Sequence, residues 1–414
     1  MRHLLVSYHT CPLEEPGAGL AGGMNVFLRG LLPGLARLGI RTDVLTRGTG
    51  SSPETTGPWP GVRIVHVPCG WKTPASREGA LDALPRFVAG ARRLVASPGQ
   101  AYDVVSAHYW MSGVAALHLF PSHRPPLAFS YHTVEALKGR PAGTRPDRLF
   151  LARTAAEGLL AGEAERVVCF TRRDLAATRK VFPRMAGKGA VIPPGVDDAF
   201  RRSRRRTGAR RLLGIPPRAF LFLLVARSDP EKNVSQAIAA FRDMAPEGPR
   251  DGVLLVAGQE RPPGAVPDGV VFAGPVPHHR MPGLYAAADA VVCPSLYESF
   301  GLVQLEAMAA GVPVIVPAGG YWGESIGREG GGLVYDPADP RGIGKAMRAV
   351  RRDDALRARL SAEAERATAA FTWERCTESW ARLLSRLSRR GSRRGTPRAP
   401  GGPRRRGAGR PGVS

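Results

Sequence analysis

The sequence predicts an α/β protein made of two doubly wound domains, and two observations lead to that prediction. Short apolar runs alternate with helical patterns through both halves of the 414 residues. This alternation is typical of parallel strands that are joined by crossover helices and covered on both faces. The chain is also too long for one ordinary hydrophobic core and long enough for two. We therefore expect two domains that face each other across a cleft.

Strand-like runs are expected in equal number in the two halves. In the N-terminal half they read HLLVSYH, RTDVLT, GVRIVHV, YDVVSAH, PLAFSYH and RVVCFT, and in the C-terminal half FLFLLVA, GVLLVAG, GVVFAG, AVVCPS, PVIVP and GGLVYD. Between them, IPPGVDDAF interrupts the pattern with two prolines and a glycine, which favours a hinge near residues 193–200. We expect an N-terminal domain over 1–195 and a C-terminal domain over 196–370.

The end of the chain differs in composition from the rest. Residues 371–388 are expected to form a helix that returns to the N-terminal domain, and residues 389–414, rich in Arg, Gly and Pro, a disordered tail. The net charge is +24, and Ala381 to Ser414 contains eleven arginines and no acid. A second basic cluster, RRSRRRTGARR, lies at 201–211. Because these two stretches hold most of the excess charge, the folded part is only mildly basic, and at most a weak tail contact with an anionic membrane or nucleic acid is expected.

The sequence favours a cytoplasmic protein without a metal. The longest apolar stretch, AFLFLLVA at 219–226, is much shorter than the roughly 20 residues of a spanning helix. The N-terminal MRHLLVSYHTCPLEEPG meets histidines and acids before a signal-peptide core could form. The five cysteines are widely spaced, with no C-x-x-C pair and no histidine at ligand spacing, so we expect reduced thiols.

Several expected strands end in residues suited to ligand binding. The first strand leads into GAGLAGGMN, where Gly22 and Gly23 allow backbone N–H groups to approach an anion, although a tight turn explains the pair equally well. Strands YDVVSAH and PLAFSYH both end in histidine. Since ligands of doubly wound sheets bind at the carboxyl ends of the strands, this edge is a candidate site.

The C-terminal half carries charged residues at matching positions. FLFLLVARSDPEKN places Arg227 and Lys232 just after a strand, and YESFGLVQLE places Glu298 and Glu306 around the start of a helix. Either cation alone would be taken as an ordinary surface residue. Two cations and a helix N-terminus together suit a diphosphate, while carboxylates accept hydrogen bonds from sugar hydroxyls. This pattern predicts a nucleotide-sugar site.

These motifs together resemble the family 4 retaining glycosyltransferases of the GT-B fold, from about residue 3 to about residue 380. The shared elements are Glu298-x7-Glu306, ARSDPEKN and PPGVDDAF. YHTCPLEEPGAGLAGGMNVF, AHYWMSG and YHTVEALK further resemble the subgroup of the mycothiol-pathway D-inositol-3-phosphate glycosyltransferases. Sucrose-phosphate synthases are more distant relatives. The resemblance implies two Rossmann-like domains, the N-terminal one binding the acceptor and the C-terminal one the nucleotide sugar.

The resemblance also implies the donor chemistry. A UDP-sugar, in particular UDP-GlcNAc, would react without metal or other cofactor and with retention of configuration, the acceptor hydroxyl attacking from the face of the leaving group. Catalytic roles are implied for His132, which would hold the sugar, and for Glu298, Arg227 and Lys232. The remaining donor contacts would come from Gly23, Gly301, Leu302, Val303 and Glu306, the last of these at the ribose.

A small phosphorylated acceptor is implied on the N-terminal side. Its phosphate would be held by Arg77, Tyr109, Thr133 and Arg153, and its ring by Asn25. The sequence departs from the subgroup at Leu20, where an acid is usual, and in GGYWGESIGREGGG, which lacks the usual Pro-Glu after Gly-Gly.

Other functions remain open from the sequence. Within the family, the acceptor could be another sugar phosphate or a lipid or polysaccharide precursor. Outside it, an epimerase or phosphorylase on the same fold and a non-catalytic nucleic-acid or membrane-binding protein acting through its basic tail are alternatives. A homodimer is also compatible with the sequence.

Overall fold

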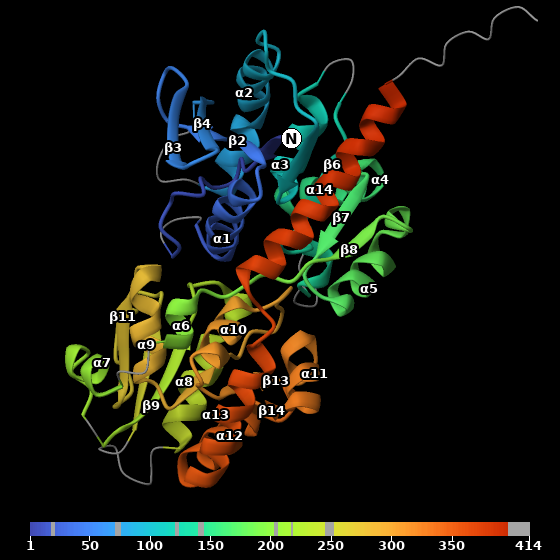
Figure 1. Ribbon diagram of the computed structural model, residues 1–414. Helices are drawn as coiled ribbons and strands as arrows, with labels where there is room; N and C mark the ends of the chain where they lie inside the picture. Colours follow the sequence, from blue (N-terminus) through green and yellow to red (C-terminus); the bar gives the residue numbers. More distant parts are fainter. Residues whose placement is uncertain are drawn as a thin grey trace, which may run out of the picture.

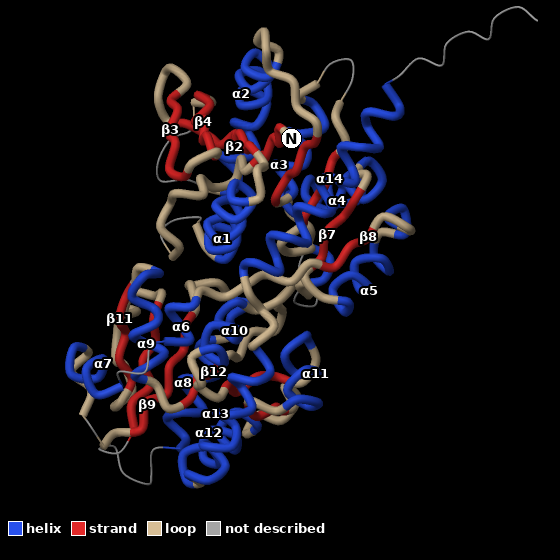
Figure 2. Tube along the Cα trace, in the orientation of Figure 1, coloured by secondary structure: helices blue, strands red, loops and turns tan. Residues whose placement is uncertain are grey.

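The computed structural model describes residues 1–17, 21–70, 76–120, 124–139, 145–202, 206–216, 218–244 and 252–395. Two β-sheets organise these residues, each covered by helices on both faces (Figure 1). The N-terminal sheet lies in the upper half of the view and the C-terminal sheet in the lower half, and Figure 2 shows helices surrounding strands in both. The predicted α/β fold of two parallel-sheet domains is thus confirmed.

The N-terminal sheet has the strand order β3-β4-β2-β1-β5-β6-β7-β8. All neighbouring strands are parallel except β3 and β4, which pair antiparallel at the edge. The strands are β1 (Arg2–Val6), β2 (Arg41–Gly48), β3 (Glu54–Trp59), β4 (Val62–Pro68), β5 (Val104–His108), β6 (Leu127–Ser130), β7 (Arg166–Cys169) and β8 (Gly189–Val191).

Alternate residues of these strands are buried under different helices. In β1, Leu5 packs in the cluster that contains α1, whereas Leu4 and Val6 pack in the cluster that contains α2, α3 and α4. This follows from the two-residue period of a strand, which requires apolar residues on both faces of a doubly covered sheet. The helical elements are α1 (Gly23–Arg37), α2 (Arg77–Val95), α3 (Trp110–His118), η1 (Glu135–Leu137), α4 (Arg148–Glu163), α5 (Arg172–Val181) and η2 (Pro183–Met185).

The C-terminal sheet is parallel throughout, with the order β11-β10-β9-β12-β13-β14. Its strands are β9 (Phe220–Val225), β10 (Gly252–Ala257), β11 (Val270–Gly274), β12 (Ala290–Val292), β13 (Val314–Pro317) and β14 (Gly332–Tyr335). Its helical elements are α6 (Asp198–Arg202), α7 (Arg206–Leu212), η3 (Pro230–Lys232), α8 (Val234–Met244), η5 (His278–Arg280), α9 (Met281–Ala287), α10 (Leu302–Ala309), α11 (Gly320–Glu329), α12 (Gly342–Arg352) and α13 (Asp354–Thr368).

The last helix, α14 (Trp373–Gly395), packs on the N-terminal domain, where it appears in red along the upper half of Figure 1. A Cβ atom at Gly30 of α1 would lie 2.2 Å from Trp373 Cε2, and one at Gly34 would lie 2.4 Å from Thr377 Oγ1. Glycine at these positions therefore lets the two helices approach closely. Trp380 is fully buried in the same core cluster, so the chain crosses between the domains twice.

Three local features differ from the sequence-based expectations. Strand β3 was not expected, because ETTGPW is largely exposed and contains Gly and Pro. Strand β8 was also not expected, because it has only three residues and lies just before the proline-rich hinge. Helix α14 continues to Gly395, beyond the expected end at 388. The rest of the predicted tail, 396–414, lies outside the described residues.

In both sheets the strand order reverses beside the first strand. The reversal falls between β1 and β5 in the N-terminal sheet and between β9 and β12 in the C-terminal sheet. Open parallel sheets bind ligands beyond the carboxyl ends of the strands at such a switch point. No helix in the described part of the chain is both long and apolar enough to cross a membrane.

Candidate active site

Segments after both switch points line one cleft between the domains, with a volume of about 360 Å³. His9 and Tyr109 reach it from the ends of β1 and β5, and Arg227 and Glu298 from the ends of β9 and β12. The two sheets therefore present their ligand-binding edges to each other.

An ion pair joins the ends of two C-terminal strands in this cleft. Lys232 Nζ, on η3 after β9, lies 2.6 Å from Glu298 Oε1, which follows β12. Burial alone would lower the pKa of Lys232, but the attraction of Glu298 and the hydrogen bond to it outweigh burial and raise that pKa. Arg227 pairs with Asp229 at 3.1 Å beside it. Two cations thus lie together at the carboxyl end of the sheet.

Helix α10 begins next to these cations. Its N-cap, Gly301, has φ of 92° and provides no capping side chain, and Leu302 and Val303 in the first turn line the cleft. A Cβ atom at Gly301 would lie 2.4 Å from Gln304 Oε1, so this position requires glycine. The uncapped N–H groups of the first turn and the helix dipole favour an anion here.

Glu306 is held inside the cleft by two partners. Its Oε1 is 2.9 Å from His278 Nε2, and its Oε2 accepts a hydrogen bond from the Tyr285 hydroxyl at 3.0 Å. The side chain is nearly buried but still contributes to the cleft lining. Burial opposes the charged form of His278, yet Glu306 raises the pKa of His278 overall. Since a carboxylate has about four acceptor positions, Glu306 can still accept a bond from a ligand hydroxyl.

The glycine pair of the N-terminal loop lies against the C-terminal domain. A Cβ atom built at Gly22 would be 3.7 Å from Arg227 Cζ, and one at Gly23 would be 3.3 Å from Leu302 Cδ1. A side chain at Gly23 would crowd Leu302, so glycine there helps the start of α1 to approach the α10 N-terminus, whereas the distance at Gly22 is an ordinary van der Waals contact. Both glycines line the cleft.

His132 lines the cleft from the end of β6 in an unusual backbone conformation, with φ of 60°. Its Nε2 lies 2.9 Å from His108 Nδ1, and Ser299 of the C-terminal domain donates a hydrogen bond to its carbonyl oxygen. Burial lowers the pKa of His132 to about 3, so the ring is neutral. A left-handed non-glycine residue held in this way is typical of functional sites.

Three of the residues predicted to hold the acceptor phosphate lie together. Arg153 donates to the Tyr109 hydroxyl at 3.1 Å and to the carbonyl and hydroxyl oxygens of Thr133 at 2.8 and 2.9 Å. Its guanidinium also lies 4.9 Å from the centre of the Tyr109 ring. Arg77, the fourth predicted member, is the first residue of α2, but its side chain lies outside what the structure describes.

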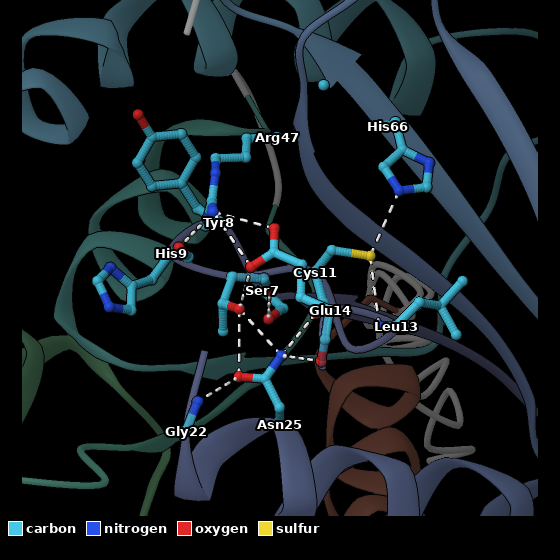
Figure 3. Close-up of polar contacts among 12 residues, drawn as sticks. Ser7, Tyr8, His9, Cys11, Leu13, Glu14, Gly22, Asn25, Arg47 and His66 are labelled. Atoms are coloured by element: carbon cyan, nitrogen blue, oxygen red, sulfur yellow. Dashed lines mark hydrogen bonds and ion pairs between the residues drawn. The ribbon is translucent and has the colours of Figure 1, made fainter. Parts of the chain in front are cut away.

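The side chain of Asn25, predicted to bind the acceptor ring, makes hydrogen bonds within the N-terminal loop in this structure. Its side chain is fully buried, and its amide nitrogen donates to Thr10 Oγ1 at 2.9 Å and to the Cys11 carbonyl at 2.6 Å (Figure 3). Its amide oxygen accepts the Gly22 N–H at 3.0 Å. In this structure Asn25 therefore stabilises the loop that carries the glycines. Leu20, in the same loop, lies outside the described residues.

Sequence reasoning missed two groups at the site. Trp322, within the divergent GGYWGES segment, donates from Nε1 to the Gly301 carbonyl at 3.0 Å and so fixes the start of α10. Lys138 Nζ lies 3.2 Å from both Glu135 of the N-terminal domain and Glu231 of the C-terminal domain. Glu135 and Lys138 both lie in the motif YHTVEALK, just after an expected strand. This position of an acid and a cation could have identified Lys138 as a site residue.

Two family models match the chain, one for each domain. The model described as "Glycosyl transferase 4-like domain" matches residues 22–195, and "Glycosyl transferases group 1" matches residues 206–367. The boundary between the two matches falls in the segment that connects the sheets.

Full-length relatives show the same similarity. The D-inositol 3-phosphate glycosyltransferase of Geodermatophilus obscurus is 36% identical over 90% of this chain and 87% of its own length. That of Xylanimonas cellulosilytica is 31% identical over 94% of this chain and 97% of its own length.

Solved structures agree with the fold. The sucrose-phosphate synthase of Thermosynechococcus elongatus has a TM-score of 0.82 and 27% identity, over 93% of this chain and 98% of its own. Anabaena HepE in complex with UDP and glucose has a TM-score of 0.66 and 19% identity, over 93% of this chain and 99% of its own.

Proposed function

The chain belongs to the family 4 glycosyltransferases with the GT-B fold, and on that basis we propose that it transfers a sugar from a UDP-sugar to a hydroxyl of a small phosphorylated acceptor. The proposed donor is UDP-GlcNAc and the proposed acceptor an inositol phosphate. One observation supports this most strongly: Lys232 and Glu298 are 2.6 Å apart beside Arg227 and the uncapped start of α10. Cations, helix N–H groups and a carboxylate are what a sugar diphosphate requires.

In this proposal the C-terminal domain binds the nucleotide sugar. Arg227, Lys232 and the first N–H groups of α10 stabilise negative charge on the diphosphate as it leaves, which is electrostatic stabilisation of the transition state. Glu298 accepts hydrogen bonds from sugar hydroxyls, and Glu306 does so from the ribose. The binding of UDP and glucose by the HepE structure supports a nucleotide-sugar donor.

The acceptor binds on the N-terminal side in the same proposal. Arg153, Tyr109 and Thr133 form a compact polar group at the cleft, and the names of the curated relatives support inositol phosphate as the acceptor. Neutral His132 holds the donor sugar. The acceptor hydroxyl attacks from the leaving-group face, the departing phosphate takes its proton, and configuration is retained without a metal.

A sugar phosphate is the second candidate acceptor. The structural similarity to sucrose-phosphate synthase, with a TM-score of 0.82, favours it among the alternatives. Both acceptors carry a phosphate, so the group around Arg153 would serve either.

A cytoplasmic reaction is part of the proposal and is consistent with five free, buried cysteines, which suit a reducing compartment. A homodimer and a weak contact of the basic tail with an anionic membrane or nucleic acid stay predictions.

The proposal is tested by a donor screen that follows release of free nucleotide. UDP-, ADP- and GDP-sugars are crossed with inositol phosphate, a sugar phosphate and their unphosphorylated forms, each with and without excess EDTA. We expect turnover with UDP-GlcNAc and a phosphorylated acceptor, unaffected by EDTA. Strict dependence on Mg²⁺ or Mn²⁺ would contradict the metal-free mechanism, and equal rates with unphosphorylated acceptors would contradict the acceptor assignment.

A further inference from the structure

Each nitrogen of the Arg153 guanidinium has a partner in this structure. Its Nε donates to Glu157 Oε1 at 2.7 Å, and its Nη2 donates to both oxygens of Thr133 at 2.8 and 2.9 Å. Its Nη1 donates to the Tyr109 hydroxyl at 3.1 Å and lies 2.7 Å from Glu135 Oε2. Four of the five N–H donors of Arg153 are thus used in hydrogen bonds, and Glu135 occupies the space beside Nη1 as an ion pair. A phosphate therefore gains access to Nη1 when Glu135 moves away.

Glu157 is not the partner that can leave. Its side chain is fully buried, and besides Arg153 its carboxylate accepts the backbone N–H of Glu135 at 3.0 Å. Moving Glu157 would leave a buried charge and a backbone donor without partners, which is costly.

Glu135 can leave more easily. Its side chain is 23% exposed, and its buried Oε2 makes no hydrogen bond that would hold it in place. It also sits on η1, a 3-10 helix of only one turn. Its Oε2 already has a second cation, Lys138 Nζ, at 3.2 Å. A small rotation of the side chain would therefore keep the Glu135 charge paired while it vacates Arg153.

We propose that Glu135 is a specificity-determining residue of the acceptor site, whose carboxylate occupies the position on Arg153 that an acceptor phosphate takes. This rests on the proposed phosphorylated acceptor. A phosphate ester brings nearly two negative charges and three strong acceptor oxygens, so it displaces the single carboxylate onto Lys138. A neutral hydroxyl cannot do so, and the site therefore rejects the unphosphorylated acceptor.

The receiving cation also connects the two substrates. Lys138 Nζ lies 3.2 Å from Glu231 Oε1 across the cleft, and Glu231 directly precedes Lys232 of the donor site. When Glu135 turns to Lys138, it competes with Glu231 for the same ammonium group. Acceptor binding thus alters an interdomain ion pair next to the nucleotide site.

The test measures binding of inorganic phosphate to the full chain saturated with UDP, by calorimetry. Glu135→Gln removes the competing charge at nearly unchanged size, and we expect it to bind phosphate about three- to tenfold more tightly than the unaltered protein. The KM for the phosphorylated acceptor should fall by a similar factor, while the KM for the nucleotide sugar stays unchanged. The matched control is Asp82→Asn, which removes an acid from an exposed pair with Arg148 on the same domain and should change neither constant.

Glu135→Asp gives an independent measurement, because it keeps the charge but withdraws the carboxylate by one methylene, and it should also bind phosphate more tightly than the unaltered protein. Unchanged or weaker phosphate binding in whichever of the two variants folds overturns the role of Glu135. If, in that case, the unaltered protein still prefers a phosphorylated acceptor, the proposed function survives. If neither the unaltered protein nor the variants bind phosphate, both the inference and the phosphorylated acceptor fail.

Discussion

Lys232 Nζ and Glu298 Oε1 lie 2.6 Å apart, which places a cation and an anion from two neighbouring strand ends in direct contact within the interdomain cleft. In the proposed mechanism each has its own part of the donor: the ammonium group faces the diphosphate and the carboxylate the sugar. Their contact keeps both charged groups paired before the donor binds, which limits the cost of holding them in a partly buried site.

Lys232→Ala and Arg227→Ala should each lower kcat on the order of 10²–10³-fold, because each removes a charged hydrogen bond that strengthens as the leaving group gains charge. Steady-state rates with saturating donor measure this. Arg242→Ala is the matched control, since Arg242 pairs with Asp243 on the exposed surface of α8. Near-native kcat in both folded variants would show that these two residues are ordinary surface cations.

Gly301→Ala should lower kcat/KM for the nucleotide sugar at least about tenfold. The new Cβ would face Gln304 Oε1 at 2.4 Å, and the backbone φ of 92° is unfavourable for alanine. The strain would displace the N–H groups that meet the diphosphate. Gly283→Ala in α9, where a Cβ meets nothing within 4 Å, should keep full activity. If the Gly301→Ala variant keeps its affinity for the donor, the start of α10 does not take part in donor binding.

Arg153→Lys should raise the KM for the phosphorylated acceptor far more than the KM for the nucleotide sugar. Lysine keeps the charge but loses the planar fork that reaches Tyr109 and Thr133 together. The measurement is the KM for each substrate together with the melting temperature. An unchanged melting temperature shows that a change in KM does not come from a loss of folding. If both constants rise equally, Arg153 has a structural role.

The pH dependence of stability should reveal the buried histidines. Burial lowers the pKa of His3 and of His132 to about 3 each, below the value near 6.5 in the unfolded chain. As the pH falls from 6.5 toward 3, the unfolded state binds protons that the folded state does not, so each histidine reduces stability by roughly 1.4 kcal/mol per pH unit.

His3→Gln tests this directly, because glutamine can keep bonds to Thr42 and Ser106 without titrating. Urea unfolding between pH 4 and 7 should show a pH slope about one proton smaller in this variant. Identical slopes in the two proteins would mean that folding does not shift the pKa of His3.

Much of this architecture is visible in the sequence because it depends on local patterns. Buried parallel strands need apolar residues on both faces, so the central strands were found, whereas the exposed edge strand β3 and the three-residue β8 carry no such pattern. Lys232 and Glu298 were identified because each follows a strand whose end must face the ligand edge.

Partners far apart in the sequence could not be predicted in this way. The side-chain amide of Asn25 donates hydrogen bonds to Thr10 and Cys11 because the loop folds back over it. The GGMN motif does not indicate these partners. The pairing of Glu135 with Arg153 depends on η1 lying against α4. Trp322 lies 21 residues after Gly301 in the chain, so no local pattern indicates the hydrogen bond between them.

One product analysis tests the proposed reaction: the full chain is incubated with UDP-GlcNAc and inositol phosphate in EDTA, and the products are followed by NMR. We expect equal amounts of UDP and of a new glycoside of inositol phosphate, whose anomeric configuration matches that of the donor. A product with inverted configuration, or donor hydrolysis and epimerisation with no glycoside at all, would contradict it.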